Sequence, residues 1–157
     1  MLDKPRILRT IAQQAAIIRL TIPRDQIRQV MGPAIQELMA ALAAQGVAPA
    51  GPRFAHHLNM DLDIFDFEIG VTVTAPVAQA GRVTAGLLAG AMVARAVFHG
   101  GYEGLGAAWG EFNAWITAEG HTPGPDFWEC YITGPESNSD SRAWRTELNR
   151  PLTDWKT

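Results

Sequence analysis

The chain has 157 residues, 47% of them hydrophobic and 18% charged, which is enough to bury a core without disulfide or metal crosslinks. Thirteen basic residues against sixteen acidic ones give a formal net charge of −3, which argues against direct nucleic-acid binding. The single cysteine, Cys130, excludes an internal disulfide and suits a reducing compartment.

Two absences place the chain among soluble proteins. The N-terminus is basic, but polar residues interrupt the apolar run that a signal peptide requires. No later segment reaches the roughly 18 uncharged apolar residues of a membrane span. We therefore expect one cytoplasmic domain over residues 1–157, with no membrane partner and no DNA-binding module before the first strand.

A weak internal repeat, with a spacing of about 74 residues, organises this domain. Gly46 and Pro49 in one copy correspond to Gly120 and Pro123 in the other, and each pair stands between a predicted helix and a predicted strand. The two copies cover about residues 7–76 and 82–152.

In the first copy, "AIIRLTIP" reads as a strand that Pro23 ends, because proline has no N–H for a β-ladder. A short turn then leads to Pro33, and proline favours the first position of a helix. "PAIQELMAALAAQ" has the apolar stripe of a helix packed on one side, and Gly46 ends it. "RFAHHLNM" and "IFDFEIGVTVTA" follow as strands.

The second copy repeats this order. "RVTAGLLAGAMVARAVFHG" carries a strand, and "GYEGLGAAWGEFNAWITAEG" reads as a helix whose apolar stripe includes Trp109. "DFWECYITG" and "WRTELNRPL" are strands on either side of a polar loop at 136–141, and Glu147 takes the place of Glu68. Two β-α-β-β units predict an α+β fold with an antiparallel sheet, two main helices, a pseudo-two-fold axis and a cleft between the copies.

The acid in "DFWECYITG" is the first candidate for a functional residue. Side chains alternate along a strand, so Phe127, Glu129 and Tyr131 share one face and Cys130 takes the other. A buried acid between two aromatic residues is costly unless something pairs with it. Glu129 is therefore either satisfied by a backbone donor or an arginine, or it faces a ligand.

The repeat adds a second candidate. Aligning Phe54 with Phe127, by a one-residue slip, places His56 opposite Glu129 and predicts that Phe54 and His56 face the same cleft. The alternative is that His56 is merely half exposed on its strand. His57 points to the other face, so the two histidines cannot share one metal ion, and we expect no metal site.

Two residues of the second helix are further candidates. Tyr102 begins the helix and Trp109 lies on its apolar stripe, so each either lines the cleft or packs in the core. No phosphate-binding loop or nucleophile elbow is present in the sequence, and we expect no cofactor.

The whole pattern resembles the GyrI-like small-molecule-binding family, also called the bacterial transcription activator effector-binding domain. The matching residues are His99, Gly100, Tyr102, Leu105, Trp115, Ile116, Gly120, Glu129, Tyr131 and Pro135. The chain departs from the family pattern at Cys130 and Gly134. The resemblance implies an aromatic cleft in which Glu129 is the buried anion that binds hydrophobic, aromatic or cationic compounds, as in multidrug binding.

The resemblance also implies two alternatives. One branch of the family is hydrolytic and opens cyclopropane-containing electrophiles, with help from the glutamate that Glu129 matches. Other members inhibit gyrase by protein interaction. Direct transcription regulation by a stand-alone domain of this kind would need a separate protein partner. The oligomeric state, a lid function of loop 136–141, and occupation of the cleft by Trp109 stay open.

Overall fold

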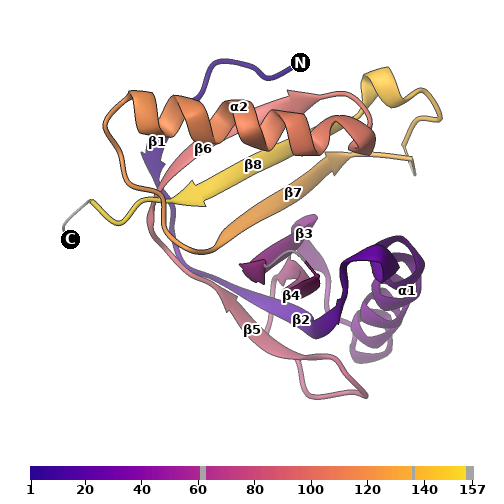
Figure 1. The fold of residues 1–157 in the computed structure, drawn as a ribbon. Helices are drawn as coiled ribbons and strands as arrows, with labels where there is room; N and C mark the ends of the chain where they lie inside the picture. Colours follow the sequence, from indigo (N-terminus) through magenta and orange to yellow (C-terminus); the bar gives the residue numbers. More distant parts are fainter. Residues whose placement is uncertain (61–62, 136, 155–157) are drawn as a thin grey trace. The chain divides into compact units, whose positions relative to one another are not determined.

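A computed structural model describes residues 1–60, 63–135 and 137–154 (Figure 1). The chain divides into two compact units, each with one long helix. The α1 unit is Ile11–Gly90 and contains helix α1 (Ile27–Gln45). The α2 unit combines Met1–Thr10 with the chain from Ala91 onward and contains helix α2 (Leu105–Ala118). Neither of these helices, nor any other in the described ranges, is long and apolar enough to cross a membrane.

The α1 unit is a four-stranded antiparallel sheet with one helix. In chain order it contains β2 (Gln13–Pro23), the 3-10 turn η1 (Arg24–Gln26), α1, β3 (Pro49–Met60), β4 (Ile64–Val73) and β5 (Thr84–Leu88). The strands lie in the order β3-β4-β2-β5. In β2, burial alternates from Ile18 to Thr21, with Ile18 and Leu20 buried and Arg19 and Thr21 exposed, whereas residues 15–18 are all buried.

The α2 unit repeats this plan. It contains β1 (Arg6–Arg9), β6 (Met92–His99), the 3-10 turn η2 (Tyr102–Gly104), α2, β7 (Phe127–Thr133), the 3-10 turn η3 (Ser141–Ala143) and β8 (Arg145–Pro151). Its antiparallel order is β7-β8-β6-β1, so each β-strand has a counterpart at the same place in the other unit. The predicted α+β fold, built from two β-α-β-β units with two main helices, is confirmed.

The helix cores keep the repeat spacing of 74 residues. Ala34, Leu38 and Leu42 are the deeply buried positions of α1, and Ala108, Phe112 and Ile116 are those of α2. Each helix is followed by a glycine with positive φ, 67° at Gly46 and 81° at Gly120, a conformation that other residues rarely adopt. In the α2 unit, the core helix residues pack on Ala94, Ala96, Phe98 and Leu148 of the sheet.

Two predicted boundaries were wrong. Helix α1 begins at Ile27, so Pro33 lies inside the helix and not at its first position. The proline is exposed there, and its missing N–H costs one hydrogen bond without disturbing the buried side of the helix. The segment between residues 82 and 100, predicted to carry one strand, carries two, β5 and β6, which belong to different units and are separated at Gly90.

Candidate functional site

Glu129 lies on the face of the α2-unit sheet that α2 covers. Its register partner is Leu148, which packs in the core beneath the helix, and the residue is only 8% exposed. Both carboxylate oxygens accept a hydrogen bond. The indole Nε1–H of Trp109 donates to Oε2 at 2.7 Å, and the hydroxyl of Tyr131 donates to Oε1 at 3.0 Å. Helix and strand therefore each supply one donor to the buried acid.

The electrostatics of Glu129 combine two opposing effects. Burial raises the pKa of the Glu129 carboxyl above its ordinary value, and the hydrogen bonds from Trp109 and Tyr131 lower it in part. Burial, followed by the nearby charge of Glu129, raises the pKa of Tyr131, so this hydroxyl keeps its proton and remains a donor. Within residues 1–60, 63–135 and 137–154, no lysine, arginine or histidine forms an ion pair with Glu129.

Aromatic rings extend from Glu129 in two directions. On the Trp109 side, the Phe127 ring centroid is 4.5 Å from that of Trp109, and the Arg150 guanidinium lies over Phe127 at 5.3 Å. On the other side, the edge of Tyr102 meets Tyr131 with ring centroids 5.9 Å apart. The side with Phe127 thus already holds a cation of the protein, whereas the side with Tyr131 and Tyr102 presents aromatic surface, and Tyr102 is 38% exposed.

Trp144 continues the Tyr102 side, with ring centroids 5.0 Å apart, and it was missed by the sequence reasoning. Its indole Nε1–H donates to the Asn138 carbonyl at 2.7 Å, and its own carbonyl accepts from the Gly100 N–H at 3.1 Å. The signal that pointed to it was present in the sequence, because Trp144 stands between the polar loop and the "RTEL" strand and directly precedes β8.

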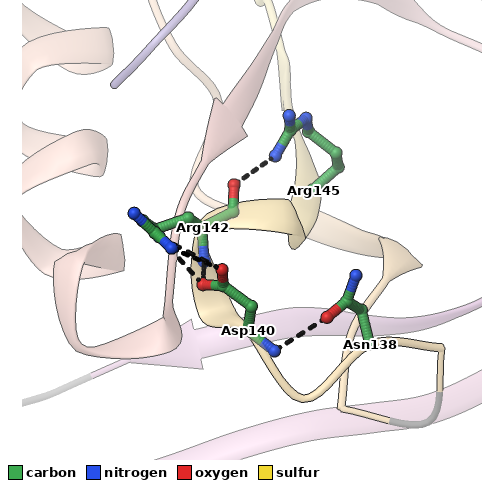
Figure 2. Close-up of polar contacts among 4 residues, drawn as sticks. All are labelled: Asn138, Asp140, Arg142 and Arg145. Carbon is green, nitrogen blue, oxygen red and sulfur yellow. Dashed lines mark hydrogen bonds and ion pairs between the residues drawn. The ribbon is translucent and has the colours of Figure 1, made fainter.

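The loop before Trp144 is held by local polar contacts, which Figure 2 shows. Asp140 accepts from the backbone N–H of Arg142 and binds its guanidinium in a fork, with the shorter contact at 2.8 Å. Asn138 accepts from the Asp140 N–H, and Arg145 donates to the Arg142 carbonyl. Within the predicted loop 136–141, Asn138 and Asp140 therefore make local polar contacts, and residue 136 lies outside the described residues.

Five of the seven predicted site residues come together in the α2 unit. These are Glu129, Tyr131, Phe127, Tyr102 and Trp109. Whether they contact a ligand stays a prediction. Cys130, on the opposite face, is buried, and burial raises the pKa of its thiol to about 12, so it is an unreactive core residue. Among the described residues, no group of three or more His, Cys, Asp or Glu side chains is placed to hold a metal ion.

The alignment of His56 with Glu129 was wrong by one residue. Ala55 pairs with Ile69 in the α1 unit as Glu129 pairs with Leu148 in the α2 unit. Ala55 also stands 74 residues before Glu129, the spacing that both helix cores keep. Because a slip of one residue moves a side chain to the other face of the sheet, His56 corresponds to Cys130 and not to Glu129.

Phe54 and His56 accordingly make contacts within the α1 unit that differ from those of Glu129. His56 Nδ1 lies 3.6 Å from a carboxylate oxygen of Glu68, its register partner. Phe54 is 2% exposed and its ring packs against Gly70, where an added Cβ would come within 2.7 Å of the ring. Both residues therefore lie on the sheet face that corresponds to the Cys130 face of the α2 unit.

The α2 unit is thus a helix-covered antiparallel sheet that carries a buried carboxylate flanked by aromatic rings. The family model described as "GyrI-like small molecule binding domain" matches residues 3–152, and the chain belongs to this family. No sequence of a curated protein matches the chain.

Solved structures show the same fold at low sequence identity. The EcmrR C-terminal domain superposes with a TM-score of 0.84 and 18% identity, covering 97% of this chain and 98% of that one. EcmrR in its complex with DNA gives a TM-score of 0.83 and 19% identity, and there 95% of this chain spans 57% of the EcmrR chain.

Two further neighbours are a ligand complex and a hydrolase. SAV2435 bound to tetraphenylphosphonium has a TM-score of 0.67 and 14% identity, over 96% of this chain and 94% of that one. A hydrolase from Listeria innocua has a TM-score of 0.68 and 14% identity, over 96% and 92%.

Proposed function

We propose that the chain captures hydrophobic organic cations, with Glu129 as the anion that binds them. The observation that carries this proposal is a carboxylate that is 8% exposed and forms no ion pair with any basic side chain in the described part of the chain. A buried charge without a counter-ion is costly, and a bound cation would offset that cost. The fold neighbour SAV2435 with its bound phosphonium supports the same class of ligand.

The aromatic residues account for the hydrophobic part of the proposed specificity. Each ring face that meets a desolvated cation contributes roughly 0.5–2 kcal/mol. Because Arg150 already lies over Phe127, the ligand cation would meet Tyr131, Tyr102 and Trp109 more readily than Phe127. Trp109 holds Glu129 in the free protein, so a ligand either binds beside the indole or displaces its hydrogen bond.

Binding and protonation of Glu129 are linked in this proposal. Burial raises the pKa of the free carboxyl, and a bound cation favours the ionised form and lowers that pKa. Complex formation therefore releases a proton wherever the pH lies between the free and bound pKa values. The affinity for a permanent cation should rise with pH up to the free pKa and then become constant.

The test is calorimetric titration of tetraphenylphosphonium into wild type, Glu129→Gln and the control Glu111→Gln, which alters an exposed acid on α2. Glutamine keeps the shape of the site, since its oxygen accepts from Trp109 and its amide donates to Tyr131. We expect Glu129→Gln to weaken binding at least about tenfold, or about 1.4 kcal/mol, and Glu111→Gln to leave it unchanged. Equal affinity of wild type and Glu129→Gln would overturn the proposal.

Hydrolysis of a reactive electrophile is the second candidate. It is favoured by the raised pKa of Glu129, which brings the carboxyl closer to the range of a general acid or base, and by the hydrolase among the fold neighbours. Incubation with electrophilic compounds, followed by mass spectrometry, separates the two functions. Gain of one water in wild type and not in Glu129→Gln indicates a hydrolase, whereas recovery of intact compound indicates capture.

Protein interaction of the gyrase-inhibiting kind stays a prediction. A pull-down with gyrase tests it. If gyrase is not enriched over background, this prediction is wrong.

A further inference from the structure

One flank of α2 borders the site. Trp109 contacts Glu129 from this helix, and Tyr102, at the turn that opens it, contacts Tyr131. Residues spaced by three, four or seven positions share a helix flank, so Gly106 and Asn113 lie on the same side as these two aromatic residues. We call Tyr102, Gly106, Trp109 and Asn113 the ligand flank of α2.

Asn113 is the unexplained residue of the ligand flank. Its Oδ1 atom is buried and makes no hydrogen bond within the described part of the chain. Buried acceptors in folded proteins are nearly always paired, and asparagine is a poor residue for a helix interior. Neither local hydrogen bonding nor helix formation therefore accounts for an amide at this position.

Gly106 leaves the same flank open. A Cβ added there would meet no atom within 4 Å, and the backbone of Gly106 does not have a positive φ. Steric crowding and backbone conformation thus give no reason for glycine, which is the least favourable residue after proline in a helix. Along the ligand flank Gly106 lies between the two aromatic residues Tyr102 and Trp109.

We propose that Asn113 is a specificity-determining residue, whose Oδ1 accepts a hydrogen bond from an N–H group of a flat aromatic cation held against Gly106. The inference rests on the proposed function, because Glu129 supplies the charge that binds the cation. Asn113 is one helical turn beyond Trp109, a rise of about 5–6 Å. The ligand class is therefore a planar cation with an amino or amidinium N–H about that far from the centre of its charge.

Two probes measure how much a ligand N–H group contributes to the affinity. Proflavine is a planar cation with amino N–H groups, and 10-methylacridinium is a planar cation of similar shape without any N–H. Fluorescence titrations of both are made with wild type, Asn113→Leu and Glu129→Gln. Wild type should bind proflavine roughly 3- to 10-fold more tightly than 10-methylacridinium, the range expected for one hydrogen bond.

Asn113→Leu should remove this preference by weakening proflavine alone, while Glu129→Gln should weaken both probes. Equal weakening of both probes by Asn113→Leu, or of neither, would overturn the role of Asn113. If Glu129→Gln leaves both unchanged, it is the proposed function that fails. Because Oδ1 has no partner in the free protein, the Tm of Asn113→Leu should not fall, and a clear fall would show a structural role instead.

The opening at Gly106 has its own matched control. Gly106→Leu adds a side chain on the ligand flank, and Ala107→Leu adds the same side chain at the next, exposed position, which is turned away from the flank. Gly106→Leu should weaken both probes at least tenfold and Ala107→Leu neither. Unchanged binding by Gly106→Leu would show that the ligand does not lie against this flank and would refute the placement.

Discussion

The buried histidine of the α1 unit makes a quantitative prediction about acid stability. His57 is 6% exposed, stacks on Phe67 with ring centroids 5.3 Å apart and meets Phe65 edge-on at 5.7 Å. Burial, and secondarily the neighbouring His56, lowers the pKa of His57 from 6.5 to about 4. The imidazole is therefore neutral in the folded protein at neutral pH.

The direction of the pH dependence of stability follows from the lowered pKa of His57. Between pH 6.5 and 4 the unfolded chain binds a proton at His57 that the folded chain does not, so the folded state loses stability as the pH falls through this window. A shift from 6.5 to about 4, at 1.36 kcal/mol per pH unit, corresponds to roughly 3 kcal/mol. Above pH 6.5 the contribution of His57 to the pH dependence vanishes.

Urea unfolding of wild type and His57→Leu at intervals from pH 4 to 7.5 measures the effect. The difference between their free energies of unfolding should change by roughly 3 kcal/mol across the window, since other titrating groups cancel in the difference. His99→Gln, at a more exposed histidine, serves as the control substitution. A pH-independent difference between wild type and His57→Leu would refute the reasoning. Ligand titrations should be made above pH 6.5, where protonation of His57 does not change the stability of the fold.

Three further predictions concern the α2 unit. Because the pKa of Glu129 is raised, its ionisation costs stability as the pH rises above 4.5, so the stability of Glu129→Gln relative to wild type should increase with pH; a constant difference in urea unfolding would contradict this. Phe112→Ala removes a fully buried ring and should lower the free energy of unfolding by about 3–5 kcal/mol, whereas a loss under about 1 kcal/mol would show that the core collapses around the gap. Asp140→Ala removes the cap and fork that hold the exposed loop, so hydrogen exchange at the Arg142 amide should accelerate with little change in Tm; unchanged exchange would show that the loop is held elsewhere.

The sequence predicted the parts of the fold that depend on periodicity. The apolar stripes located both helix cores, and alternation along β7 correctly placed Glu129 and Tyr131 on one face and Cys130 on the other. The start of α1 was misplaced because Pro33 resembles a helix-opening residue, and its tolerance inside the helix depends on its exposure, which the sequence does not reveal.

The site was predictable only in part, for a similar reason. A one-residue slip in the repeat alignment was enough to assign His56 to the wrong face, since strand side chains alternate with a period of two. Contacts that cross between elements, such as Trp109 to Glu129 and Trp144 to Tyr102, depend on how helix and loop pack on the sheet. No local pattern encodes these distances.

The placement of the edge strands bears on the order in which the chain can fold during synthesis. β1 comes first in the chain but pairs with β6, as Arg6 opposite Arg95 shows, whereas β5 pairs with β2 inside the contiguous stretch Ile11–Gly90. The whole α1 unit is therefore synthesised before β6, the partner of β1, is available. The unit that carries Glu129 pairs strands that lie far apart in the sequence and can be completed only after β8 has been synthesised.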